Sequence, residues 1–148
     1  MMWTDCSFEL KFGGLGLSFT AIDHEMTHLP AYKFSVAGEI YHPTGLITYT
    51  ADDIWMTAES LSRFLSDLEP LAKQRVGRAV LESMGNELVV SIESHLGSLR
   101  ASAKIREYEP LNDDVTVNAS LSSPDIDVVN VWLRSLQEFL ATVRFSGA

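Results

Sequence analysis

The chain has 148 residues, of which 46% are hydrophobic and 21% are charged. A chain of this size usually forms one domain and buries about two-thirds of the surface that its unfolded form exposes, so we expect a single domain spanning residues 1–148. The 20 acidic and 11 basic residues give a formal net charge of −9. This charge argues against a nucleic-acid or anionic-membrane partner, because both are bound by basic surfaces.

Cys6 is the only cysteine, so the chain can form no internal disulfide and no zinc site with four cysteine ligands. A reducing cytoplasm is therefore the expected location. The N-terminal residues lack the basic start and apolar core of a signal peptide. No apolar run approaches the roughly 20 residues of a membrane helix.

The first third of the chain predicts antiparallel strands. Apolar residues alternate with polar ones from Phe8 to Phe12 and again from Leu15 to Phe19, on either side of a glycine turn, which is typical of a hairpin. The same alternation over 31–41 and the β-branched and aromatic residues of 46–50 predict two further strands, with a turn over 42–45.

A helix over about 57–69 follows. Thr57 is the candidate N-cap. The apolar side chains fall at helical spacing and form one stripe, which consists of Leu61, Phe64, Leu65 and Leu68. Pro70 lacks a backbone donor, so we expect it to end or kink the helix near Glu69.

The second half of the chain repeats this order. Four segments alternate in polarity and are separated by short turns, as in a β-meander. A closing helix over about 124–144 begins at Pro124 and carries an apolar seam from Ile126 to Val143. We therefore predict an α+β fold with an antiparallel sheet of about six to eight strands and both helices packed on one of its faces.

One motif is typical of a known class of enzyme. Residues 24–28 read H-E-x-x-H, in which His24 and His28 on one helix face bind zinc and Glu25 acts as the general base of a hydrolase. Pro30 and the β-branched residues upstream disfavour that helix, and the third ligand of the extended motif is missing. We therefore expect a loop between early strands, no bound metal or other cofactor and no catalytic residues, and keep a small zinc hydrolase as the alternative function.

Acidic pairs gather at two places in the sequence. Asp52 and Asp53 lie ahead of the first helix, and an acidic segment between two later strands contains Glu107, Glu109, Asp113 and Asp114. Clustered acids on a net acidic protein suit the recognition of a basic partner. These six residues are the candidate partner-binding residues.

Residues 45–145 resemble the WapI-type immunity proteins. The likeness lies in the strand-to-helix entry from Asp53 to Phe64, in two glycine-led strands that begin at Gly77 and Gly97, and in the closing amphipathic helix. The resemblance implies a small cytoplasmic bacterial protein that binds and silences a cognate toxin domain, commonly a nuclease, without chemistry of its own. It implies no binding residues by position, because that surface varies between members.

A homodimer is compatible with either function. An antiparallel sheet leaves an edge or a face that a second copy can close. The sequence therefore leaves open whether the chain acts as a monomer or a dimer.

Overall fold

The computed structural model describes residues 6–147, except positions 28, 43, 97, 108–114 and 124–126. Four strands and a helix occur twice in succession. The first unit consists of β1 (Ser7–Phe12), β2 (Leu15–Glu25), β3 (Ala31–His42), β4 (Gly45–Thr57) and α1 (Ala58–Gln74). The second consists of β5 (Arg78–Glu82), β6 (Leu88–His95), β7 (Ser98–Glu107), β8 (Val115–Ser123) and α2 (Asp127–Gly147).

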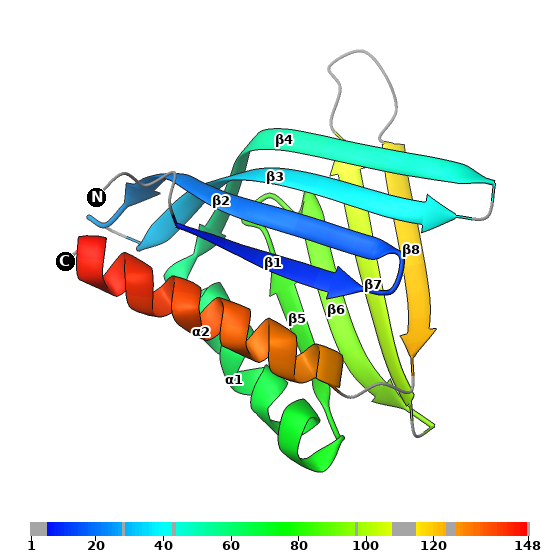
Figure 1. Ribbon diagram of the computed structural model, residues 1–148. Helices are drawn as coiled ribbons and strands as arrows, with labels where there is room; N and C mark the ends of the chain where they lie inside the picture. The colour runs from blue at the N-terminus through cyan, green and yellow to red at the C-terminus, as the bar shows by residue number, and fades with distance from the viewer. Residues whose placement is uncertain are drawn as a thin grey trace.

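Each unit forms its own antiparallel meander. The strand orders are β1-β2-β3-β4 and β5-β6-β7-β8, and Figure 1 shows the two sheets crossing, with both helices below the first sheet. The predicted α+β class, the antiparallel strands and the two helices are confirmed. The eight strands form two sheets rather than one, because α1 carries the chain away from β4 before β5 begins.

Helix α1 starts where the sequence predicts. The side chain of Thr57 accepts a hydrogen bond from the backbone N–H of Ser60 at 3.0 Å, which satisfies one of the free donors of the first turn. The predicted end near Glu69 is wrong, since the helix continues past Pro70 to Gln74. Leu71 is fully buried one residue after the proline, and its burial offsets the lost backbone hydrogen bond.

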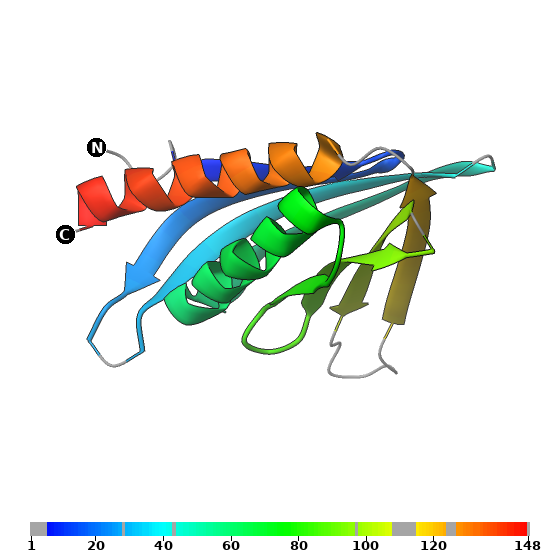
Figure 2. The ribbon, with the colours of Figure 1, turned by 90° about the horizontal axis from the view of Figure 1, so that it is seen from below.

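Two β-bulges bend the first sheet at the same level. Ala21 and Asp23 pair with consecutive residues of β3, so Ile22 is an extra residue. On the other side of β3, the register places both Asp52 and Asp53 opposite Ser35. Because bulges bend and twist a strand, the sheet curves around the helices, as Figure 2 shows for β2 and β3.

The core between the first sheet and α2 is built on aromatic rings. Phe8 stacks on Phe19 with ring centroids 4.5 Å apart and meets Phe34 edge to face at 5.6 Å. Phe139 of α2 lies 5.1 Å from Phe8 and 5.6 Å from Phe34. Aromatic pairs at these separations add to the stability that area burial gives, so they tie the second helix to the first sheet.

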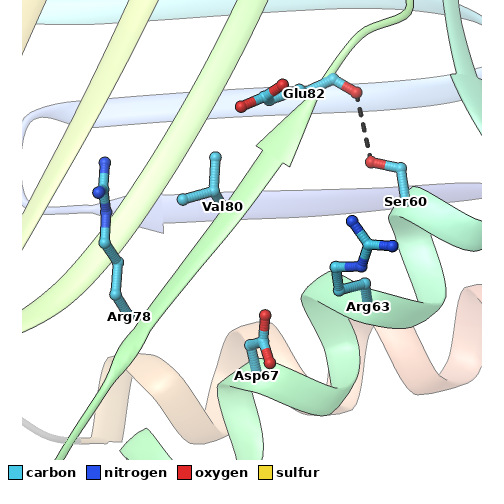
Figure 3. Close-up of a pocket in the computed structure, with 6 residues that line it drawn as sticks. All are labelled: Ser60, Arg63, Asp67, Arg78, Val80 and Glu82. Atoms are coloured by element: carbon cyan, nitrogen blue, oxygen red, sulfur yellow. Dashed lines mark hydrogen bonds between the residues drawn. The ribbon is translucent and has the colours of Figure 1, made fainter.

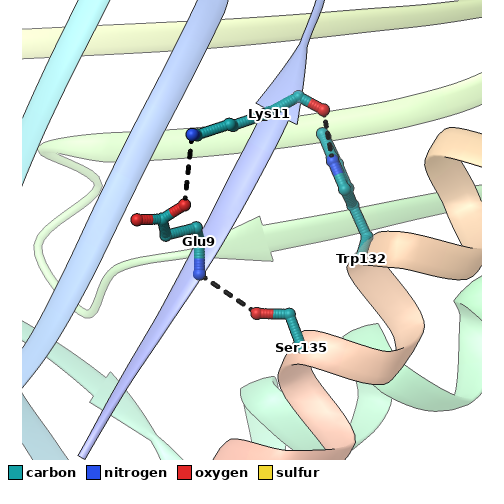
Figure 4. A network of polar contacts seen from close by, with 4 residues as sticks. All are labelled: Glu9, Lys11, Trp132 and Ser135. Carbon is teal, nitrogen blue, oxygen red and sulfur yellow. Dashed lines mark hydrogen bonds and ion pairs between the residues drawn. The ribbon is translucent and has the colours of Figure 1, made fainter.

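Helix α2 also covers the free edge of β1 (Figure 4). The indole Nε1–H of Trp132 donates to the carbonyl oxygen of Lys11 at 2.7 Å, and the Ser135 hydroxyl accepts from the backbone N–H of Glu9 at 3.1 Å. The same indole packs against Phe12 and, from α1, Phe64. Trp132 therefore joins both helices to the edge of the first sheet.

Within the described part of the chain, neither helix has both the length and the apolar character needed to cross a membrane.

Trp132→Phe should lower the free energy of unfolding by about 1–3 kcal/mol, because the Lys11 carbonyl loses its donor and a smaller ring fills the site. Urea unfolding followed by circular dichroism measures the change. Val131→Ala on the same helix is the control, since Val131 is 57% exposed and its truncation should cost little. Equal stability of the wild type and Trp132→Phe would show that Trp132 does not secure this edge.

Pro70→Ala should raise the free energy of unfolding by about 1–3 kcal/mol, because alanine restores a backbone donor inside α1 without a buried side chain to accommodate. The same urea titration measures it. A loss of stability would mean that the proline's restriction of the unfolded chain outweighs the helix defect.

Candidate partner-binding face

The outer face of the first sheet is the face turned away from both helices. Buried and outward-facing residues alternate along its strands. The registers place Glu9, Ser18, Ala37 and Thr50 in one row across the four strands. The next row contains Lys11, Gly16, Glu39 and Thr48. Ser18 and Ala37 at the centre of the first row, and Gly16 in the second, are small residues, so another protein can come close to the sheet there.

Acidic residues dominate this outer face. Its exposed acids are Glu9, Asp23, Glu25, Glu39, Asp52 and Asp53, against two bases, Lys11 and Lys33. Six acids and two bases give a net charge of −4, against the −9 carried by the whole chain. The Lys11 ammonium lies 3.4 Å from the Glu9 carboxylate in an exposed ion pair, so the other acids hold most of the uncompensated charge.

Asp52 and Asp53 owe their exposure to the bulge in β4. The sequence suggests a strand that ends at Thr50, but β4 continues through both aspartates to Thr57. The Ser35 hydroxyl donates to Asp52 Oδ1 at 3.0 Å, which fixes this carboxylate on the outer face. The bulge gives two adjacent carboxylates in place of the one that a regular strand would present there.

An aromatic and an aliphatic side chain lie at one end of the acidic face. Tyr41 and Leu46 are directly opposite each other on β3 and β4 and are 60% and 50% exposed. The Tyr41 hydroxyl donates to Glu39 Oε2 at 3.0 Å, and this hydrogen bond to a carboxylate raises the pKa of Tyr41. Exposed tyrosine is enriched among the residues that dominate protein interfaces. The pair therefore marks an anchor point beside the acids.

The six candidate acids predicted from the sequence do not all reach this face. Asp52 and Asp53 do, whereas Glu107 ends β7 in the second sheet. Glu109, Asp113 and Asp114 lie outside the described residues. Sequence reasoning missed Asp23, Glu39 and Tyr41. The alternation with buried Ile40 could have shown that Glu39 and Tyr41 point outward, whereas Asp23 is turned outward by the bulge at Ile22, which alternation does not predict.

The second sheet presents a different charge balance. Among its described outward side chains, the bases are Arg78, Arg100, Lys104 and Arg106 and the acids are Glu82 and Glu93. Four bases and two acids give +2, so of the two sheets, as far as the structure describes them, the first carries the acidic charge. Such segregation orients a charged partner during encounter.

A polar groove of about 230 Å³ lies between α1 and β5 (Figure 3). Ser60, Arg63 and Asp67 line it from the helix, and Arg78, Val80 and Glu82 from the strand. The Ser60 hydroxyl donates to the Glu82 carbonyl at 3.4 Å, and Arg63 pairs with Glu59 on its own helix at 2.7 Å. The groove holds opposite charges in equal number and no histidine or cysteine, so it lacks a side chain that ordinarily titrates near neutral pH.

The H-E-x-x-H segment is not helical where the structure describes it. His24 and Glu25 end β2, and Met26 and Thr27 belong to the following loop. His28 lies outside the described residues. Glu25 accepts hydrogen bonds from the hydroxyl and, at 2.7 Å, the backbone N–H of Thr27. These bonds lower the pKa of Glu25, which moves it away from the near-neutral value that favours a general base.

The described residues contain no group of three or more histidine, cysteine, aspartate or glutamate side chains placed to hold a metal ion. Cys6 is buried. The zinc-binding geometry that the motif requires therefore has no counterpart in residues 24–27.

Comparisons with known proteins do not identify a function for this chain. No protein-family model matches the chain, and a search of curated proteins found no match. Among solved structures, the chain is similar to one titled "Crystal structures of trypanosoma bruciei MRP1/MRP2", at 12% sequence identity and a TM-score of 0.45. That match covers 90% of this chain and 78% of the other, and at this score it carries no functional weight.

We expect His24→Ala to leave the zinc content of the purified protein unchanged, because residues 24–27 do not form the helix that brings both imidazoles to one face. Atomic emission after incubation with equimolar zinc and desalting measures it, and His95→Ala is the matched histidine control. One zinc per chain that is lost in His24→Ala and kept in His95→Ala would restore the hydrolase alternative.

Proposed function

We propose that this chain is an immunity-type binding protein that neutralises a cognate bacterial toxin by covering its functional surface, with no chemistry of its own. The observation that carries the proposal is the outer face of the first sheet, with its net charge of −4 and its exposed Tyr41–Leu46 pair. The resemblance of residues 45–145 to WapI-type immunity proteins supports the same function. The protein would act in the cytoplasm of the cell that makes the toxin.

The charge of the face suggests what it binds. A nuclease attracts phosphate and therefore tends to carry a basic substrate-binding surface. The acidic face would approach that surface by electrostatic steering, and short-range complementarity would then fix the register of the complex. Covering the basic surface both blocks the substrate physically and neutralises the charge that attracts it.

The central part of the face suits a protein interface. Ser18, Ala37 and Thr50 are small and share one row, so two backbones can come close over a wide area. Tyr41 and Leu46 supply apolar contact at one end, while Asp52 and Asp53 supply charge on the same strand pair. An apolar anchor beside short polar side chains and peripheral charges is typical of stable complexes.

The test is binding to the toxin-like domain encoded beside this gene. Asp52→Lys/Asp53→Lys should weaken the complex at least tenfold and remove protection of cells that express the toxin, because two attractive charges become repulsive. Isothermal titration calorimetry at two salt concentrations gives the affinity, and a growth assay gives the protection.

Asp67→Lys/Glu69→Lys provides the matched control. It makes the same change in net charge at two exposed acids on α1, away from the proposed face, and should keep wild-type affinity and protection. The proposal is wrong if the neighbouring domain does not bind, or if both double variants bind equally well.

A further inference from the structure

The two edge strands of the first sheet, β1 and β4, differ in how their outward backbone groups are hydrogen-bonded. At β1, α2 satisfies backbone groups that have no neighbouring strand, since Ser135 accepts from the Glu9 N–H and Trp132 donates to the Lys11 carbonyl (Figure 4). At β4, the described backbone makes one such contact, in which the carbonyl of Trp55 accepts from the N–H of Met84 at 2.8 Å. That contact lies near the end of β4 where α1 begins.

The rest of the β4 edge has no adjoining strand among the described residues. β4 ends the strand order of the first sheet. Figure 1 shows it along the upper margin, with the β3–β4 hairpin reaching outward at the right. A sheet edge of this kind presents backbone donors and acceptors that another strand can pair with.

The side chains of this edge favour pairing. From Leu46 to Ala51 the strand has no charge and no proline and is rich in strand-forming residues. Leu46 and Ile47 are 50% and 44% exposed. Protein edges are commonly protected by charges, prolines or bulges, and here the bulge at Asp52 and Asp53 protects only the end beyond this segment.

We propose that a second copy of this chain pairs antiparallel along Gly45–Ala51, with a two-fold axis at Thr48, and joins the two first sheets into one eight-stranded sheet. In this register Leu46 lies opposite Thr50 of the partner subunit, and Ile47 lies opposite Tyr49 of the partner subunit. The interface between the two β4 strands is called the seam below. Both exposed apolar side chains gain a neighbour across this seam.

Charge favours a second copy over a foreign basic strand. A copy carries the same −9, so it can meet this chain closely only where the surface is neutral, and the segment from Leu46 to Ala51 is neutral. A basic partner would be drawn instead to the acidic outer face. In the proposed register Asp52 lies opposite Thr44 of the partner subunit, beyond the paired segment, so the acids of the two copies do not face each other.

A dimer with this two-fold axis is also a closed assembly, to which no further copies add through the same segment. Each copy uses the same segment, which is the isologous arrangement of the commonest soluble oligomers. The dimer would leave both acidic faces on the same side of the extended sheet, available to bind partners.

Paired charge substitutions at Thr48 test the seam. Thr48→Lys places two lysines opposite each other across the two-fold axis, and Thr48→Asp places two aspartates there. Sedimentation equilibrium should give twice the chain mass of 16.4 kDa for the wild type and the chain mass for each variant alone. An equimolar mixture of the two variants should return to the mass of a dimer, because lysine then faces aspartate.

Thr20→Lys is the control. It makes the same substitution on the outer face of β2, an interior strand of the sheet, and should remain a dimer. Circular dichroism checks that all variants keep the wild-type fold. A monomeric wild type, a dimeric Thr48→Lys, or a mixture that stays monomeric would each overturn the proposal, and a wild-type monomer that binds a toxin strand at this edge would assign the edge to a different partner.

Discussion

The indole of Trp132 holds together three parts of the molecule that lie far apart in sequence. Its ring packs between Phe12 of β1 and Phe64 of α1, and its N–H donates to the Lys11 carbonyl on the edge of the first sheet. The last helix thereby closes onto the first strand, and the two ββββα units share one hydrophobic core. Without this closure the edge of β1 would be exposed, and α2 would lose its main polar attachment to the sheet.

The same packing decides which surface is available for function. Because α1 and α2 bury one face of the first sheet, the opposite face is left to solvent with its acids, short polar side chains and the Tyr41–Leu46 pair. The helices also cover one edge and leave the other, so stability and recognition are divided between opposite sides of the sheet. A protein that acts by binding can use an exposed sheet face and needs no deep pocket. The groove between α1 and β5 contains no residues suited to catalysis near neutral pH.

Local signals predicted the elements well, and long-range pairing accounts for what they missed. The Thr57 cap and the apolar stripe of α1 are encoded within a few residues, so the start of the helix was predictable. The passage of α1 through Pro70 depends on the burial of Leu71 in the shared core. The extension of β4 through Asp52 and Asp53 depends on a bulge opposite β3. The division into two sheets and the composition of the acidic face depend on strand neighbours, which alternation alone does not specify.

The central claim is that the outer face of the first sheet is where the partner binds. Carbodiimide labelling of carboxylates, read by mass spectrometry in the free protein and in the purified complex with the toxin domain, tests it most directly. Labelling of Asp52 and Asp53 should fall strongly on complex formation, while labelling of Glu69 on α1 should stay unchanged. Unchanged labelling of the two aspartates together with protection of Glu69 would place the partner on the helical side and contradict the claim.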